Sequence, residues 1–446
     1  MDIAVIGVGY VGLVTGVCLA EKGHTVVCVD IDPEKVKRIN AGVPPIFEVH
    51  LEEMLKRLIG NRLRAETQLD QAIQESEITF IAVGTPFDGE RIDLTYVKEV
   101  SRQIGVALSK KKTYHVVVVK STVVPGTTDT VVLPLLEQHS GKKAGTDFGV
   151  GMNPEFLTEG QAIEDFMNPD RIVLGGIDDR SVGTLDRLYE GFPDTPKIRT
   201  NTRTAELIKY ASNALLATMI SFSNELADLC TVIGSIDITD VMAGVHASNY
   251  LSPLTPAGKR QKAPIASFLE AGCGFGGSCL PKDVKALSAH GASLGAQMRM
   301  LDVVIEINQA RPQRVVSLLE RHFPSLKGVR ISILGLAFKP DTDDVRETPA
   351  LPLIQVLEAR GAIVKAYDPV AVPQARAVFG KTRTTFCNSL EDSLRDVEAV
   401  VLVTRWKQFE RVPTLLAAME KPPLFLDGRR MISKTAVPRY EGIGLS

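Results

Sequence analysis

The opening residues restrict the fold more than any other part of the chain. The run GVGYVG places Gly7, Gly9 and Gly12 directly after a short β-rich run and at the start of a predicted helix. A second β-rich run ends in an acid, Asp30, at about the distance expected within one strand–helix–strand unit. Glycines in this context allow a tight turn and bring a helix N-terminus against a pyrophosphate. The pattern predicts a dinucleotide-binding parallel sheet; the alternative is a turn that merely requires glycine.

Asp30 also indicates which dinucleotide would bind. A carboxylate at this position accepts hydrogen bonds from ribose hydroxyls and repels a 2′-phosphate, which favours NAD over NADP. Two further predicted strands end in small and hydroxyl residues, within segments 82–86 and 119–127. Because ligands bind outside the carboxyl ends of parallel strands, these segments are expected at the cofactor crevice.

The rest of the chain alternates β-rich runs with helical periods, as in a parallel sheet covered by helices. The strands predicted in the first part are Asp2–Ile6, Thr25–Val29, Ile78–Val83, Val116–Val119, Phe148–Met152 and Ile172–Leu174. From Arg203 apolar residues recur at helical spacing for about seven turns. Near Leu326 the pattern of β-rich runs returns, and four more strands are predicted there. The predicted fold class is α/β, with two Rossmann-like doubly wound parallel sheets joined by a long central helix. We expect an NAD-binding domain at 1–200, a helical dimerisation region with a cysteine loop at 201–314, and a second α/β domain at 315–446.

Composition and charge argue against several classes of protein. The 446 residues are 44% hydrophobic and 23% charged with a net charge of -2, which is typical of a soluble globular chain of two or three domains. We therefore expect neither a nucleic-acid nor a membrane partner, and no apolar run reaches the length of a membrane span. The glycine-rich start lacks the positive region of a signal peptide. The six cysteines show no metal-site spacing, so we expect reduced thiols, a cytoplasmic location and no metal.

One cysteine stands in an unusual setting, the run GCGFGGSCLPKD at 272–283. The glycines around Cys279 offer no side chains to bury a thiol, but they let a ligand or another backbone come close. Pro281 is suited to the start of a helix, which would place Cys279 just before that helix and Lys282 in its first turn. A cation and a helix N-terminus both favour the reactive thiolate. The alternative is a buried, inert thiol.

Polar residues also interrupt the long predicted helix at Glu206, Lys209 and Asn213, on one face. These residues form either a surface salt bridge or a row of polar groups that faces an active-site cleft. A desolvated lysine in such a cleft stabilises negative charge that develops on a substrate oxygen. Glu155 and Glu159, in the loop 152–160, are either solvated loop acids or part of the same site.

A nicotinamide site together with a reactive thiol predicts a definite chemistry. Hydride transfer converts an alcohol to an aldehyde, the Cys279 thiolate traps the aldehyde as a thiohemiacetal, and a second hydride transfer leaves a thioester. Water then releases a carboxylic acid. The alternatives are a single-step alcohol dehydrogenase without covalent chemistry and a non-catalytic NAD-binding protein with an inert thiol.

The motifs together resemble the sugar-nucleotide 6-dehydrogenases, the UDP-glucose/GDP-mannose dehydrogenase family, over nearly the whole chain. The resemblance is carried, in the family's order, by GVGYVG, KSTVVPGTT, NPEFLTEG, DRIVLG, AELIKYASNALLATMISFSNELA, GFGGSCLPKD, GLAFKPDTDDVRETP and DGRR. It implies the NAD-dependent, two-step oxidation of a nucleotide hexose, and DRIVLG and AELIKYASNALLAT favour UDP-glucose over GDP-mannose or another nucleotide hexose. It also implies that 315–446 holds the nucleotide part of the substrate, and that the protein is a homo-oligomer built around the long helix.

The resemblance further implies roles for individual residues. The catalytic positions are Cys279 as the nucleophile, Lys209 and Asn213 at the reacting oxygen, Asp283 and Thr122 around a catalytic water, and Glu155 as the base for thioester hydrolysis. The substrate contacts are Glu155, Phe156, Leu157, Thr158, Glu159, Lys209, Asn213, Phe268, Leu269, Glu270, Ala271, Gly272, Gly276, Phe338, Lys339 and Arg429. The NAD contacts are Gly7, Gly9, Val11, Gly12, Asp30, Lys35, Thr85, Thr122, Glu159, Lys282 and Arg346. The first proton is taken either by a water on Asp283 or by Lys209 itself.

The sequence departs from the family's pattern at one place. The family often has an Arg-Ile-Gly element before the Phe268–Leu269 pair, and its arginine reaches the substrate of a neighbouring subunit. Here the sequence reads KAPIASFL after a longer loop, and Arg260 and Lys262 are the candidates to replace that arginine.

Overall fold

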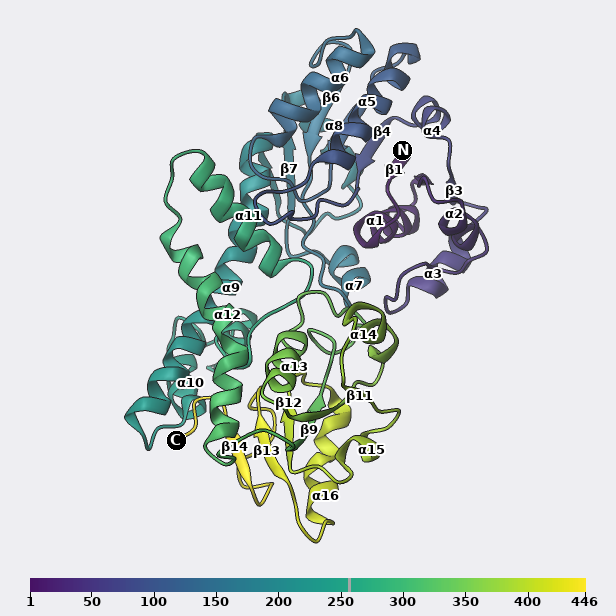
Figure 1. Ribbon diagram of the computed structural model, residues 1–446. Coiled ribbons are helices and arrows are strands. Elements are labelled where there is room, and N and C mark those ends of the chain that lie inside the picture. Colours follow the sequence, from purple (N-terminus) through teal and green to yellow (C-terminus); the bar gives the residue numbers. More distant parts are fainter. Residues whose placement is uncertain (256–257) are drawn as a thin grey trace. The chain divides into compact units, whose positions relative to one another are not determined.

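A computed structural model describes residues 1–255 and 258–446. The chain divides into two compact units, Met1–Ser212 and Asn213–Ser446. Each unit contains one sheet covered by helices (Figure 1). The predicted fold class is confirmed, whereas the separation of a helical region at 201–314 from a domain at 315–446 stays a prediction.

The first unit is built on an eight-stranded sheet. Its strands are β1 Asp2–Ile6, β2 Thr25–Val29, β3 Leu63–Glu66, β4 Ile78–Ile81, β5 Val116–Val119, β6 Gly149–Met152, β7 Ile172–Gly176 and β8 Lys197–Thr200. Their order in the sheet is β3-β2-β1-β4-β5-β6-β7-β8, and the first six follow the order of a dinucleotide-binding sheet. Neighbouring strands are parallel except β6 and β7, which are antiparallel.

Alternate residues of the central strand pack into different cores. Ile3 and Val5 of β1 belong to one hydrophobic cluster, and Ala4 and Ile6 belong to another. Both clusters are buried, which explains why the strand reads as one continuous apolar run. The helices that cover the sheet are α1 Tyr10–Glu21, α2 Pro33–Asn40, α3 Leu51–Leu58, α4 Leu69–Glu75, α5 Thr95–Lys110, the π-helical turn η1 Thr128–Val132, α6 Leu133–Ser140, α7 Ala162–Met167 and α8 Asp179–Leu188.

The second unit contains a six-stranded parallel sheet in the order β11-β10-β9-β12-β13-β14. Its strands are β9 Arg330–Leu334, β10 Ile363–Tyr367, β11 Thr385–Phe386, β12 Ala399–Leu402, β13 Leu424–Asp427 and β14 Tyr440–Gly442. Its helices are α10 Ile238–His246, η2 Pro264–Phe268, α11 Leu280–Ser293, α12 Arg299–Glu320, α13 Ala350–Ala359, α14 Val372–Val378, α15 Leu390–Leu394, η3 Lys407–Arg411 and α16 Val412–Ala417. The predicted strands correspond to β9, β10, β12 and β13, and β11 and β14 are additional short edge elements.

The long helix predicted from Arg203 is α9, Thr202–Ile233, and the division between the units falls within it. Among the described residues, α9 passes a length-and-composition criterion for a membrane span, with a mean hydropathy of 1.2 and 33% of that window buried. No uninterrupted apolar run in the sequence reaches that length, because serine, threonine and asparagine interrupt the apolar residues without adding charge. Core helices pass the same criterion, so it does not place α9 in a membrane.

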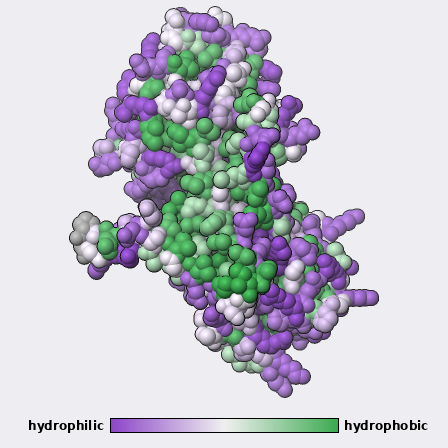
Figure 2. All heavy atoms as spheres, turned by 90° about the vertical axis from the view of Figure 1, so that its left-hand side faces the viewer, coloured by the Kyte–Doolittle hydropathy of each residue, from purple (hydrophilic) through white to green (hydrophobic). Residues whose placement is uncertain are grey.

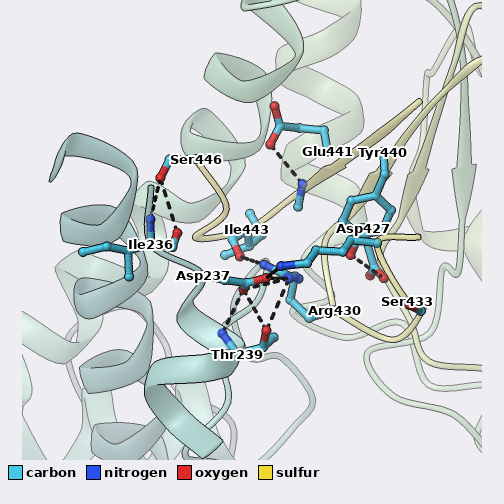
Figure 3. A network of polar contacts seen from close by, with 12 residues as sticks. Ile236, Asp237, Thr239, Asp427, Arg430, Ser433, Tyr440, Glu441, Ile443 and Ser446 are labelled. Atoms are coloured by element: carbon cyan, nitrogen blue, oxygen red, sulfur yellow. Dashed lines mark hydrogen bonds and ion pairs between the residues drawn. The ribbon is translucent and has the colours of Figure 1, made fainter. Parts of the chain in front are cut away.

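A buried ion pair fixes the C-terminal end of the chain in the second unit (Figure 3). Arg430 donates to Asp237 at 2.8 Å, and their side chains are 7% and 5% exposed. Arg430 also donates to the carbonyl of Ile443, and Ile238 donates to the carbonyl of Gly444. The pair therefore joins the start of α10 to the last residues, immediately beside Arg429.

Replacing Asp237 with asparagine is expected to cost about 3 kcal/mol of unfolding free energy, because the Arg430 guanidinium would stay buried without its counter-charge. Burial raises the pKa of the Asp237 carboxyl, but bonds from Arg430, Thr239 and Lys434 outweigh burial and hold that pKa well below its usual range. The contribution of this carboxylate to the unfolding free energy is therefore complete above about pH 4 and falls as the pH is lowered further. Urea unfolding between pH 3 and 7 measures both effects. Asp240→Asn, an exposed substitution on α10, is the control, and equal stability of the two variants would contradict the prediction.

Candidate functional site

Each glycine of the first motif meets a different requirement. Gly7 has φ of +94°, and a Cβ added there would lie 2.8 Å from the carbonyl oxygen of Ala82. A Cβ on Gly12 would lie 1.8 Å from the carbonyl oxygen of Gly7, so this residue allows α1 to pack closely against the loop. A Cβ on Gly9 would meet nothing within 4 Å. The surface at Gly9, the N-cap of α1, is therefore open to the approach of a pyrophosphate.

Asp30 follows β2 and is tied to the same loop. Its carboxylate accepts the backbone N–H of Val8 at 2.9 Å and that of Asp32 at 3.0 Å. These bonds hold the side chain beside the glycine loop and leave acceptor positions for ribose hydroxyls. Lys35 lies in the first turn of α2, and its N–H donates to the N-cap Asp32; Val11 lies half-buried in the first turn of α1.

The ends of β4 and β5 are also tied together. Thr85 donates through its hydroxyl to the carbonyl of Thr122 at 2.8 Å, and Ser121 donates to the carbonyl of Val83 at 2.7 Å. Both tied segments follow the carboxyl ends of their strands. The structure thus brings the predicted residues Thr85 and Thr122 together at the edge of the sheet where a dinucleotide binds.

Glu206 is neither in a surface salt bridge nor in an open cleft. It is fully buried, and its carboxylate accepts the N–H groups of Gly126 and Thr128 and the Thr128 hydroxyl. Burial raises the pKa of Glu206 to about 7, although these donors favour the charged form. Glu206 therefore anchors the loop after β5 to α9, a structural role that corrects both interpretations of this residue.

Lys209, in contrast, forms a buried ion pair. Its ammonium lies 2.9 Å from Glu155, and the two side chains are 4% and 5% exposed. Glu155 also accepts the N–H of Leu157 at 2.7 Å. Burial opposes ionisation of Glu155, but Lys209, the Leu157 N–H and Lys120 outweigh it, so the pKa of Glu155 lies below its usual value. The surface-salt-bridge and solvated-acid interpretations are therefore wrong for this pair.

Of the remaining residues of this segment, Phe156 lies beside the pair. The Phe156 ring is stacked by the Arg171 guanidinium at 3.9 Å, and Lys209 lies 5.6 Å from the ring centre. Thr158 donates its N–H to Asp165 at 2.7 Å, and Glu159 is partly exposed at the end of the loop.

The second unit brings the predicted thiol and three predicted polar residues together. Cys279 is the N-cap of α11 and is partly exposed, and its sulfur lies 3.5 Å from the Ser278 hydroxyl. Asp283, in the first turn, is 1% exposed. Its carboxylate accepts from Asn213 at 2.6 Å and from Lys282 at 2.6 Å. The other five cysteines within the described residues are buried, so Cys279 is not the buried thiol of the alternative interpretation, and its reactive role stays a prediction.

A pocket of about 280 Å³ reaches the residue that follows the thiol, Leu280. Its lining includes seven of the predicted substrate contacts, Phe268, Glu270, Ala271, Gly276, Phe338, Lys339 and Arg429. Leu269 and Gly272 are not on this pocket, because Leu269 is buried and Gly272 packs against Gly428. Lys339 and Arg429 give the pocket cationic groups, as a diphosphate requires.

The glycine-rich loop before Cys279 fits closely against its neighbours. A Cβ on Gly276 would lie 2.3 Å from the carbonyl oxygen of Glu347, and one on Gly277 would lie 2.7 Å from the Phe338 ring. Gly277 also donates its N–H to the carbonyl of Arg346 at 3.0 Å. These contacts position the loop that carries the thiol, while the Arg346 side chain pairs with Asp344 at 2.7 Å.

The two candidates for the missing arginine have partners within their own chain. Arg260 donates to the carbonyls of Ala247 and Ser252 and to the Asn249 side chain. Lys262 lies 3.6 Å from Glu270. Glu270 also pairs with Arg405, a pocket residue that the sequence does not reveal because its position follows no recognisable motif.

Comparison with known proteins assigns the chain to a protein family. Models of the UDP-glucose/GDP-mannose dehydrogenase family match residues 1–193 as the NAD binding domain, 203–310 as the central domain and 332–434 as the UDP binding domain. The chain belongs to the UDP-glucose/GDP-mannose dehydrogenase family. The family predicted from the motifs is confirmed, and with it an NAD-dependent dehydrogenase. The open surface at Gly9 and the Asp30 carboxylate, which the Val8 N–H holds beside the glycine loop, fit NAD.

Individual family members are similar over their full length. UDP-glucose 6-dehydrogenase AglM of Haloferax volcanii is 40% identical over 99% of this chain and 100% of its own. GDP-mannose 6-dehydrogenase of Pseudomonas putida is 37% identical over 99% of this chain and 100% of its own. The solved UDP-glucose dehydrogenase of the hyperthermophilic archaeon Pyrobaculum islandicum is 39% identical with a TM-score of 0.90, covering 100% of this chain and 98% of that one.

Replacing Gly9 with alanine is expected to weaken NAD binding at least about tenfold without affecting the fold. The added methyl meets no protein atom within 4 Å, so it would occupy space left for the pyrophosphate. Isothermal titration calorimetry with NAD and thermal unfolding measure the two effects separately. Gly183→Ala, on α8, adds the same methyl where nothing lies within 4 Å and is the control. Unchanged NAD affinity in Gly9→Ala would contradict the prediction.

Proposed function

We propose that this dehydrogenase oxidises UDP-glucose to UDP-glucuronate, with two molecules of NAD consumed for each sugar. The observation that carries the proposal is the partly exposed Cys279 at the N-terminus of α11, one residue from a pocket with cationic groups. The curated relatives named UDP-glucose 6-dehydrogenase support the choice of sugar. The predicted division at 1–200, 201–314 and 315–446 would give the nucleotide half of the substrate to the C-terminal domain, in agreement with the matched UDP binding domain.

Bound NAD supplies a hydride acceptor for each of the two oxidations. In the first, the C6 hydroxyl of the glucose loses its proton to a water held by Asp283 and Thr122, or to Lys209 itself. Lys209 and Asn213, one turn apart on α9, hold the oxygen and stabilise its developing charge. Loss of hydride from C6 then leaves an aldehyde.

The second oxidation uses the thiol. The Cys279 thiolate adds to the aldehyde carbon, a carbon–sulfur bond forms, and the carbonyl oxygen becomes the oxyanion of a thiohemiacetal. The positive end of α11 favours the thiolate before this addition. Loss of a second hydride from the same carbon gives a thioester on Cys279.

Hydrolysis completes the reaction. Glu155 accepts a proton from a water, the resulting hydroxide attacks the thioester carbon, and the carbon–sulfur bond breaks. The products are the sugar carboxylic acid, which loses its proton to solvent, and the Cys279 thiolate. The low pKa of Glu155 keeps this base ionised near neutral pH.

A panel of nucleotide sugars with NAD, monitored by NADH absorbance, tests the proposal. UDP-glucose should be the best substrate and should yield two NADH for each sugar consumed. A best rate with GDP-mannose, or with another nucleotide hexose, would replace the substrate; the similarity to the Pseudomonas putida protein makes GDP-mannose the second candidate. One NADH for each sugar would reject the thioester route.

We also propose that the protein is a cytoplasmic homo-oligomer. In the second unit, apolar residues of α9 remain exposed one or two turns apart, among them Leu215, Phe222 and Leu229 at 52%, 48% and 52%. Val303 of α12 is 47% exposed as well. Figure 2 shows hydrophobic residues gathered on the face that carries these helices. Such a surface is typical of a subunit interface.

Replacing both Phe222 and Leu229 with glutamate is expected to dissociate the oligomer, because the charges would have to be buried without partners. Sedimentation velocity of the wild-type chain and the variant measures the change in mass. Val378→Glu, at an exposed apolar position of α14, is the matched control and should leave the mass unchanged. A wild-type chain that sediments as a monomer would refute the homo-oligomer.

A further inference from the structure

Lys120 is a buried cation to which neither the motifs nor the proposed mechanism gives a role. It follows β5 directly, its side chain is 4% exposed, and its ammonium donates to the side-chain oxygen of Asn153 at 2.8 Å. The faces of Phe80 and Phe166 lie 6.0 Å and 5.8 Å away. A buried ammonium that donates to a neutral amide is costly unless a carboxylate nearby balances its charge.

The partner of Lys120 is held rigidly and leads to Glu155. The oxygen of Asn153 also accepts the Tyr189 hydroxyl at 2.6 Å, and its amide nitrogen donates to the carbonyl of Val173 at 2.8 Å. The N–H of Asn153 donates to the carbonyl of Val119 at 2.9 Å. Asn153 and Glu155 are separated only by Pro154. Lys120 therefore fixes the start of the segment that carries the carboxylate.

The three charged groups of this cluster do not balance. Glu155, Lys209 and Lys120 are all buried, and these three groups together carry two positive charges and one negative. In this structure the Lys209 ammonium is paired with the Glu155 carboxylate at 2.9 Å. If Lys209 turned to an oxyanion on the sugar, Glu155 would remain buried without it and would take up a proton unless another cation were near.

We propose that Lys120 is a positioning residue that keeps Glu155 ionised while Lys209 acts on the substrate oxygen. The proposal rests on the roles given above to Glu155 and Lys209. It gives a role to the second cation that acts on Glu155, a cation that remains in place when the reaction puts a negative charge on the sugar beside Lys209. The groups that act electrostatically on Glu155 are Lys209 from α9, Lys120 from the end of β5 and the N–H of Leu157.

The first test is the pH dependence of thioester hydrolysis, measured as the second phase of NADH formation and acid release. Lys120→Gln removes the charge but can still donate to Asn153. The acid limb of the profile, where the hydrolysis rate falls as the pH is lowered, is expected about one pH unit higher in this variant than in the wild-type chain. The rate should recover at alkaline pH. Lys120→Arg keeps the charge and should retain the wild-type limb. A limb unchanged in Lys120→Gln would overturn the proposal, as would an equal loss of rate at every pH.

A second measurement does not depend on turnover. Carbon-13 NMR of chain labelled at the glutamate carboxyl carbons gives the titration midpoint of Glu155, whose signal is identified by its loss in Glu155→Gln. The midpoint should rise in Lys120→Gln and in Lys120→Met, and an unchanged midpoint would overturn the proposal. A wild-type chain that gives no NADH from any nucleotide sugar would reject the proposed function, while the midpoint would still decide the coupling.

The matched control is Lys111→Met. Lys111 is also a buried lysine of the first unit, 5% exposed, but it donates to the carbonyls of Ile73 and Gln74. Its loss should lower the thermal midpoint and leave both the acid limb and the Glu155 titration unchanged. A shift in Lys111→Met equal to that in Lys120→Gln would assign the effect to general destabilisation and overturn the proposal.

Discussion

Replacing Cys279 with alanine is expected to lower the formation of UDP-glucuronate by a factor on the order of 10³ or more, with the fold intact. In the proposed mechanism the sulfur makes the aldehyde carbon a hydride donor for the second time, and alanine offers no nucleophile. The side chain is partly exposed at the end of the glycine loop, so its removal leaves no large cavity. Chromatography of the sugar products together with NADH formed per sugar measures the loss.

The control lies in the same loop. Cys273 is 3% exposed, and its sulfur lies 3.6 Å from the carbonyl of Val403, in the core of the second unit. Cys273→Ala should cost some stability and keep two NADH for each sugar. Cys279→Ser should fail nearly as completely as alanine, because a serine hydroxyl is a far weaker nucleophile near neutral pH. Full acid formation by Cys279→Ala would remove the thiol from the mechanism.

Replacing Lys209 with glutamine should lower kcat by about 10² to 10³, the usual effect of removing one group that stabilises an oxyanion. It should also destabilise the chain by roughly 3 kcal/mol, because Glu155 would lose its partner at 2.9 Å while remaining buried. Steady-state kinetics and urea unfolding measure the two effects.

A double variant separates stability from catalysis. In Lys209→Gln with Glu155→Gln, no carboxylate is left without its ion pair, so part of the lost stability should return while activity stays low. Lys111→Gln, at a buried lysine that donates to two carbonyls, is the matched control for stability and should retain kcat. A Lys209→Gln enzyme within tenfold of the wild-type rate would show that this ammonium does not stabilise the reacting oxygen.

The local sequence predicts those features whose causes are local. Gly7 and Gly12 are required by a turn and by close packing within a few residues, so the motif predicts their environment well. Cys279 at the start of α11 follows from Pro281 in the same way. The edge strand β8 was missed because Lys197 and Arg199 interrupt the apolar pattern where a strand faces solvent on both sides.

Features that depend on distant contacts could not be predicted. Glu206 accepts hydrogen bonds from residues about eighty positions earlier, so its neighbours in sequence do not reveal that it is an anchor. Lys120 ends a run of four valines, and nothing nearby in the sequence indicates that it shares a buried site with Glu155. The antiparallel pairing of β6 and β7 likewise depends on the path of the chain between the strands rather than on their apolar character.

The close fit of Gly276 and Gly277 has a consequence for engineering a different sugar preference. A side chain at either position would collide with Glu347 or Phe338, so saturation mutagenesis of the loop should return mainly misfolded or inactive chains. Variation has to enter at lining residues of the pocket outside this close fit, such as Ser267 or Phe268. Libraries for accepting other hexoses should therefore leave the glycines and Phe338 intact and diversify those positions.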